Sequence, residues 1–383
     1  MAHQADALPW KDFASIFDFA YRSKRHHGET NLFARQRTSV QVRQLYSFVS
    51  AFVRILEEHT DKEMSMYVDV EQDDEVISES TARNIQHLVQ PTNPVFSVEG
   101  RKISFWTDRV GTANSREDKT GTFTALLLQD EMDALFSIRA EPPIQLCLKR
   151  GRCSHSCTKF GLPELVDTAM MAYICLNMLF QKTELHDAET RANYIQSGKS
   201  GDSLIMDENV LDYRSTRGYQ KMLFECTQSK TICGAVIHTI PHRQFYGYQD
   251  CSYTTEEEFG FLTLPALISR FTRGIYQPDS HDVAIVIYIL QQMGLPTELI
   301  LIILELAEYA PKGSIPIPHD PLHKKNLPEL QKYLDYCWQL LVRTNMLVKY
   351  RDNDWEGRVL ECIWKLFGVE HPRHFLRSRA NRP

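Results

Sequence analysis

The sequence lacks the features that mark secreted, membrane-spanning or nucleotide-binding proteins. Its longest apolar run, Val283 to Leu290, is far shorter than the roughly 20 residues needed to cross a bilayer. The first residues show no basic start followed by an apolar run, so no secretory signal is expected. No glycine-rich phosphate loop follows a strand pattern, which argues against a dinucleotide or kinase fold. We therefore expect a cytoplasmic protein that does not bind a membrane.

The chain also has no excess of positive charge and no regular cysteine framework. Its net charge is -6 and its pI is about 6.2, so nucleic-acid binding would have to come from a local patch. The nine cysteines are an odd number and are scattered singly. This pattern is typical of a reducing compartment and not of a disulfide scaffold.

Two clusters of metal-binding residue types are present, but neither has the spacing of a known site. The acidic stretch 57–79 lacks the glycine and the ligand positions of a calcium-binding EF-hand loop. Cys147, Cys153, His155 and Cys157 are soft ligands, but they match no zinc framework, and cations lie among them. We predict no metal ion and no cofactor.

Hydrophobic periodicity predicts an α+β fold that is predominantly α-helical with a small central β component. Helical spacing is clear over Val40 to Leu56, Pro163 to Phe180 and Trp355 to Phe367, and a shorter aromatic-rich helix is expected over Phe13 to Tyr21. A further helix is expected over Leu262 to Phe271. Residues 94–106 alternate around a Glu-Gly turn, which predicts a hairpin. A Gly/Ser-rich stretch suggests a loose division near residue 200, into parts 1–200 and 201–383.

The strongest pattern lies between Gly294 and Arg351. A first helix begins near Thr297 and is apolar nearly all round, which predicts that it is buried. Several prolines then impose an extended connector. A second helix begins near Asn326 or Pro328 and has one apolar face.

This block resembles two known families. The opening LPTELILIILEL is similar to the start of an F-box, the helical module that binds the adaptor of a cullin ubiquitin ligase, and CWQLLVR resembles its later part. A Pro-rich insertion separates the two. The longer stretch PLHKKNLPELQKYLDYCWQLLVRTNML resembles a family of fungal proteins that includes arginine-containing cyclodipeptide synthases. That resemblance implies condensation of arginine with a second amino acid, both supplied as aminoacyl-tRNA.

Basic segments supply candidates for contacts to tRNA. The region 22–43 combines cations with aromatic residues and has a single acid, and a second basic cluster lies at 149–152. A solvated loop or helix face is the plain alternative. The candidate tRNA-binding residues are Arg22, Lys24, Arg25, Arg35, Arg37, Lys149, Arg150 and Arg152.

Carboxylates supply candidates for recognition of an arginine side chain. In a helix, Asp130 and Asp133 lie on one face, one turn apart and next to an apolar wall. Such a pair is a suitable receptor for a guanidinium group, and a solvated helix face is the alternative. Glu256, in an acidic run, is a third candidate.

The candidate catalytic residues are His238, His242 and Tyr248. They follow a predicted buried strand, Cys233 to Ile240, which Pro241 ends, and we expect His242 and Tyr248 in the loop beyond it. A histidine there could act as a general base and a tyrosine could donate to a developing oxyanion. A structural role for each histidine is the alternative. The sequence therefore predicts a tRNA-dependent synthase, or else a non-enzymatic F-box-like adaptor.

Overall fold

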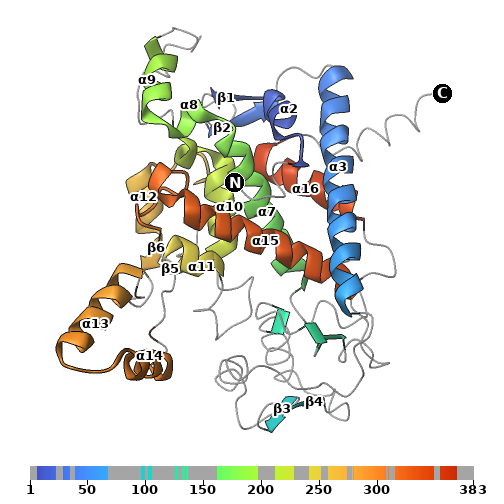
Figure 1. Cartoon of the computed structure of the whole chain (residues 1–383). Coiled ribbons are helices and arrows are strands. Elements are labelled where there is room, and N and C mark those ends of the chain that lie inside the picture. The colour runs from blue at the N-terminus through green and yellow to red at the C-terminus, as the bar shows by residue number, and fades with distance from the viewer. Residues whose placement is uncertain are drawn as a thin grey trace.

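A computed structural model confirms the predicted α+β class with a predominance of helix (Figure 1). The structure describes residues 7–22, 29–34, 39–67, 96–99, 102–105, 126–127, 132–133, 135–136, 162–196, 212–227, 241–251, 258–273, 278, 280–307, 309, 315–348 and 354–368. Within these residues the strands form three separate antiparallel pairs, β1 with β2, β3 with β4 and β5 with β6.

The helices account for most of the described chain. The α-helices are α2 (Trp10–Ser15), α3 (Ser39–Met64), α7 (Leu162–Phe180), α8 (Thr183–His186), α9 (Ala188–Gln196), α10 (Arg217–Thr227), α11 (Pro241–Tyr246), α12 (Leu264–Ser269), α13 (Ser280–Gln292), α14 (Thr297–Leu306), α15 (Leu327–Val348) and α16 (Trp355–Phe367). The 3-10 helices are η2 (Ser65–Tyr67), η4 (Tyr213–Ser215) and η7 (Lys324–Asn326). The strands are β1 (Phe17–Arg22), β2 (Glu29–Ala34), β3 (Phe96–Glu99), β4 (Lys102–Phe105), β5 (Tyr248–Cys251) and β6 (Phe271–Arg273).

Helix α7 is the centre of the bundle. Its residues are mostly apolar, and from Leu165 to Leu179 nearly all of them are buried. Helices α15, α10 and α16 pack against it, and Figure 1 shows α15 crossing α7 with α3 and α16 beside them. A helix this apolar is stable only where neighbours cover most of its circumference, as α15, α10 and α16 do here.

The core of the bundle is rich in aromatic side chains. Trp338 of α15 packs edge-on against Phe52 of α3, with ring centroids 5.3 Å apart, and lies 5.1 Å from Tyr173 of α7. Its indole Nε1 donates a hydrogen bond of 3.0 Å to Nδ1 of His59. The polar end of the largest core residue is therefore satisfied at the edge of the core, as a buried tryptophan requires.

The β1–β2 hairpin is fixed to the bundle by a buried amide. The side chain of Asn31 accepts a hydrogen bond from the backbone nitrogen of Gly218 at 3.2 Å and donates one to the carbonyl oxygen of Leu366 at 3.0 Å. Gly218 has no room for a side chain, because an added Cβ would lie 2.8 Å from that same carbonyl oxygen. The contact between α10 and α16 therefore depends on this glycine.

Most predicted elements are confirmed, including the helix begun at Val40, the central apolar helix, the 94–106 hairpin and the final helix. Two predicted helices are wrong in part. The first ends at Ser15, and Phe17 to Arg22 form a strand, in which the exposed Asp18 lies between the more buried Phe17 and Phe19. The helix predicted over Leu262 to Phe271 ends at Ser269, and Phe271 begins β6. The predicted strand Cys233 to Ile240 lies outside the described residues.

The prediction that the first helix of the C-terminal block is buried is wrong. Helix α14 has only Ile300 and Leu304 buried among its described side chains, and Pro296 just before it is exposed. Five of its large apolar side chains expose between 42% and 75% of their surface, namely Leu299, Leu301, Ile302, Ile303 and Leu306. In Figure 1 the α13–α14 hairpin projects away from the bundle. Apolar composition alone does not bury a helix, and in the part of the chain that the structure describes α13 packs on α14 and leaves most of its apolar surface uncovered.

A membrane-spanning helix is not found in the part of the chain that the structure describes.

Candidate functional site

Many of the sequence-predicted site residues fall outside the described residues. These are His238, Asp130 and Glu256, with the basic residues Lys24, Arg25, Arg35, Arg37, Lys149, Arg150 and Arg152. Arg22 is the last residue of β1. Asp133 is helical and partly buried, between the buried Met132 and Leu135 in the sequence.

His242 is described, but it does not lie in a loop. Residues 241–246 form helix α11, since proline is favourable at the first position of a helix. The imidazole is completely buried, and its Nδ1 atom lies 2.5 Å from the hydroxyl oxygen of Tyr333 on α15. Phe245 stacks on the same tyrosine ring, with centroids 4.2 Å apart. Helix α11 therefore docks on Tyr333 of α15 through the histidine–tyrosine pair and through aromatic contacts.

Burial makes His242 a neutral histidine at physiological pH. Removal from water lowers the pKa of its imidazole to about 4. Its Nε2 atom has no hydrogen-bond partner in the part of the chain that the structure describes. The Cys337 thiol, one turn after Tyr333, lies within hydrogen-bonding reach of the tyrosine hydroxyl. His242, Tyr333 and Cys337 therefore form a small buried polar cluster.

Tyr248 forms a second histidine–tyrosine pair. It is the first residue of β5, and its hydroxyl oxygen lies 2.5 Å from Nδ1 of His319. The tyrosine ring lies nearly parallel to that imidazole, with centroids 5.6 Å apart, and to the ring of Phe271 of β6, with centroids 4.5 Å apart. Tyr248 is buried, whereas His319 is half-buried, so this pair lies nearer the surface than the first one.

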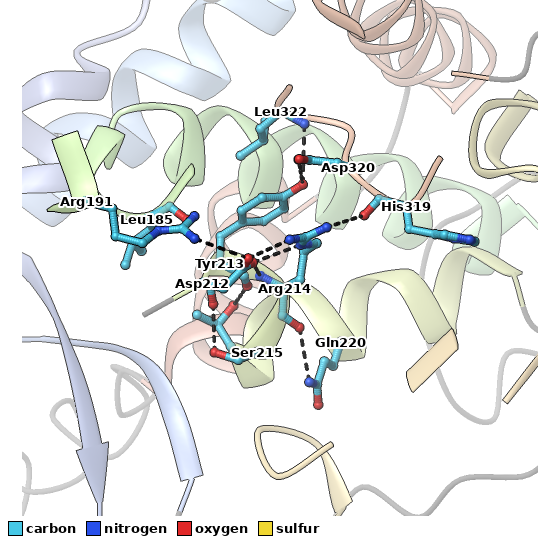
Figure 2. Close-up of polar contacts among 11 residues, drawn as sticks. Leu185, Arg191, Asp212, Tyr213, Arg214, Ser215, Gln220, His319, Asp320 and Leu322 are labelled. Atoms are coloured by element: carbon cyan, nitrogen blue, oxygen red, sulfur yellow. Dashed lines mark hydrogen bonds and ion pairs between the residues drawn. The ribbon is translucent and has the colours of Figure 1, made fainter. Parts of the chain in front are cut away.

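His319 belongs to the connector between α14 and α15, where an ionic network holds the chain in place (Figure 2). Asp212 accepts hydrogen bonds from Nε and Nη2 of Arg214 at 2.9 and 2.7 Å, and Arg191 lies 3.8 Å away. Nη1 of Arg214 then reaches the carbonyl oxygen of His319 at 3.4 Å. Burial alone would lower the pKa of Arg214, but its bonds to Asp212 raise it above the usual value, so the guanidinium stays charged.

A buried tyrosine fixes the next residue of the connector. The Tyr213 hydroxyl group donates a hydrogen bond of 2.7 Å to Oδ1 of Asp320, as Figure 2 shows. The tyrosine ring is almost fully buried, and burial raises the pKa of its hydroxyl well above the usual value. Tyr213 is therefore a permanent donor, and it holds Asp320 against the start of α10.

The two pairs share one arrangement that sequence reasoning did not find. In each, a predicted residue from segment 241–251 meets a partner from segment 315–348, Tyr333 in one case and His319 in the other. In the sequence, Tyr333 has the same helical spacing as the other residues on the apolar face of α15. The spacing therefore does not indicate a polar contact. His319 is preceded by Pro316 and Pro318, a signal only of an extended connector.

Metal binding finds no support among the described residues. They contain no group of three or more His, Cys, Asp or Glu side chains that could hold a metal ion.

The fold and the site define a helical-bundle protein with two histidine–tyrosine pairs between its β5 region and its C-terminal helical block. A family model described as "Gramillins biosynthetic cluster protein GRA5" matches residues 11–378. The chain belongs to this family, which is one of secondary metabolite biosynthesis. No curated protein and no solved structure matches the chain.

Proposed function

We propose that this protein is a tRNA-dependent cyclodipeptide synthase that condenses arginine with a second amino acid into a cyclo-Arg-Xaa diketopiperazine. The observation that carries the proposal is the Tyr248–His319 pair, in which a buried hydroxyl group meets a half-buried imidazole. Membership of a family named for a biosynthetic cluster agrees with a product of secondary metabolism. The resemblance of the 321–347 stretch to arginine-containing cyclodipeptide synthases supports the substrate class.

The chemistry of such an enzyme is acyl transfer from activated esters. The α-amino group of one aminoacyl ester attacks the ester carbonyl of the other, so the enzyme must accept a proton and stabilise an oxyanion. Tyr248 is the described residue suited to donate to that oxyanion. His238 and His242 stay candidates for the general base; the neutral imidazole of His242 is in the correct protonation state for that role.

Recognition of the two substrates is assigned to the charged clusters predicted from the sequence. Cationic side chains would bind the phosphates of arginyl-tRNA. The proposed residues are Arg22, Lys24, Arg25, Arg35, Arg37, Lys149, Arg150 and Arg152. Asp130 and Asp133, or Glu256, would bind the arginine guanidinium by charge-assisted hydrogen bonds. A cytoplasmic location follows from the need for aminoacyl-tRNA.

Replacing both Asp130 and Asp133 by asparagine is expected to lower formation of the arginine product about 10- to 100-fold. The reason is that a hydrogen bond to a charged group contributes about 1.5–3 kcal/mol. The measurement is liquid chromatography with mass spectrometry on extracts of a host that expresses each variant, with soluble protein quantified in parallel. Asp12→Asn, an exposed carboxylate on α2, is the matched control. Undiminished product from the double variant would remove this pair from the site, whereas no arginine diketopiperazine from the native protein would count against the synthase.

A second function is favoured by one observation. An F-box-like adaptor requires Pro296 and Leu299 to be exposed, and both are exposed at the start of α14. An apolar surface of this size usually marks a contact with another protein. Under this alternative the α13–α14 hairpin binds the adaptor subunit of a cullin ubiquitin ligase.

The F-box-like function predicts that substitutions on the exposed face of α14 weaken adaptor binding. Replacing Leu299 and Leu301 by aspartate should reduce capture of that adaptor at least tenfold, because two charges would be placed in an apolar contact. The assay is a pull-down with purified adaptor, and Met66→Asp, an exposed methionine on η2, is the control. Failure of the native protein to capture the adaptor would exclude the F-box-like function and leave the synthase proposal untouched.

A further inference from the structure

The backbone of His319 has an uncommon conformation. Its φ angle is 64°, and it is the one non-glycine residue with positive φ in the part of the chain that the structure describes. This left-handed conformation costs an ordinary residue about 1–2 kcal/mol. Such strained residues concentrate at functional sites, where the surrounding structure holds them in place.

The contacts on either side of His319 supply that support. The buried side chain of Asn326 accepts a hydrogen bond from the Ile317 nitrogen at 2.8 Å and donates to the Ile317 and Asp320 carbonyl oxygens at 2.8 and 2.6 Å. Arg214 and Tyr213 bind the His319 carbonyl and the Asp320 carboxylate, as described above. The connector is fixed before and after His319, and the residue between carries the imidazole to the Tyr248 hydroxyl group.

A requirement for a turn at this point of the chain does not explain why the residue is histidine. Glycine or asparagine occupies a left-handed turn at lower cost than histidine. The imidazole, moreover, is half-buried and stacked on a buried tyrosine, with its Nδ1 atom toward the hydroxyl oxygen. The position therefore holds a side chain that is unfavourable for the backbone and is suited to proton exchange with Tyr248.

We propose that His319 is a positioning residue of the aminoacyl-transfer reaction and that it acts through the hydroxyl group of Tyr248. This inference rests on the proposed synthase function. It gives the proton-transfer role to the Tyr248–His319 pair, in place of the oxyanion role of Tyr248 and of His238 or His242 as general base, with the α-amino group of an aminoacyl ester as the reacting partner.

The proposed transfer moves one proton through the Tyr248 hydroxyl group to His319. The α-amino nitrogen of one aminoacyl group attacks the ester carbonyl carbon of the other, and a C–N bond forms. The Tyr248 oxygen takes a proton from that nitrogen and passes its own hydroxyl proton to Nδ1 of His319. The C–O bond to the ribose then breaks, the proton returns by the same route, and the ribose oxygen leaves as a hydroxyl group. The same sequence in the linear dipeptidyl ester closes the ring.

The test is the His319→Gly variant with and without added imidazole, assayed with purified protein, arginyl-tRNA and a second aminoacyl-tRNA. Glycine adopts positive φ without strain, so the fold should be retained. We expect kcat to fall about 100-fold, the usual scale of acid–base assistance, with KM changed less than about threefold. Added imidazole should restore at least a tenth of the native rate. His323→Asn, at a helix cap in the same connector, is the control and should keep the native rate.

Failure of this inference can be distinguished from failure of the proposed function. An active native protein whose His319→Gly variant keeps full rate, or loses it without rescue by imidazole, overturns the role of His319 and leaves the synthase intact. An inactive native protein overturns both. Nitrogen-15 NMR of histidine-labelled protein gives a readout independent of product. Tyr248→Phe should shift the His319 Nδ1 resonance, and an unchanged resonance would remove the hydrogen bond on which the inference rests.

Discussion

Replacing Trp338 by alanine is expected to destabilise the protein by about 3–5 kcal/mol, the usual cost of truncating a buried aromatic side chain. The indole is buried between α3 and α7, in contact with Phe52 and Tyr173, and its removal leaves a cavity where three helices meet. It also leaves His59 without its tryptophan donor. The measurement is urea unfolding followed by circular dichroism, with the midpoint and slope compared between variant and native protein.

Trp364 provides the matched control, because it is a tryptophan of α16 with 45% of its surface exposed. Its replacement by alanine should cost about 1 kcal/mol or less, as for most surface substitutions. Equal losses at the two positions would contradict the packing described for α3, α7 and α15.

Acidification from pH 6.5 to pH 4 is expected to destabilise the protein by about 3 kcal/mol through His242 alone. Burial lowers the pKa of this histidine in the folded chain to about 4, below its ordinary value of 6.5. Between these values the unfolded chain binds more protons at this residue, so stability falls as the pH falls. Most of the loss has occurred by pH 4, and it is complete only below the folded-state pKa. Urea midpoints measured from pH 7 to pH 4 follow it.

The His242→Gln variant isolates this contribution, since glutamine is neutral throughout the range. Its stability should depend less steeply on pH by up to about 1.4 kcal/mol per pH unit in mid-range. His186, whose pKa burial also lowers, leaves a residual slope of the same sign. Asp187 acts mainly below this window, because hydrogen bonds from Thr190 lower its pKa from 3.8 to about 2. Parallel pH dependences for the native protein and the variant would show that His242 is not buried as described.

The sequence predicted correctly the helices that have a long hydrophobic periodicity and capping residues at their ends. Helix α16 begins at Trp355 and ends at Phe367, as predicted, with Asp354 as its N-cap and Gly368 in the left-handed conformation after its last turn. The central helix was equally clear, because a long run that is mostly apolar favours a buried helix. Helix α14 obeyed the same pattern and is nevertheless exposed, since burial depends on which neighbours the tertiary fold supplies.

The sequence predicted one residue of each histidine–tyrosine pair but not its partner. Histidine and tyrosine are concentrated in segment 241–251, which is why candidate catalytic residues were predicted there. In the structure, His242 and Tyr248 each have a polar partner. Those partners, Tyr333 and His319, are 91 and 71 residues away in the sequence. Such distant pairs depend on how α11, β5 and the connector pack, which local patterns do not encode. The expected loop at 241–246 was wrong because a proline that ends a strand can equally begin a helix.

The most direct test of the synthase function uses purified protein with arginyl-tRNA carrying labelled arginine, a second aminoacyl-tRNA, and mass spectrometry of the products. The proposal predicts a labelled cyclo-Arg-Xaa diketopiperazine that is lost when RNase is added first or when free arginine with ATP replaces the arginyl-tRNA. Well-folded protein that forms no such product from any aminoacyl-tRNA pair would contradict the proposal.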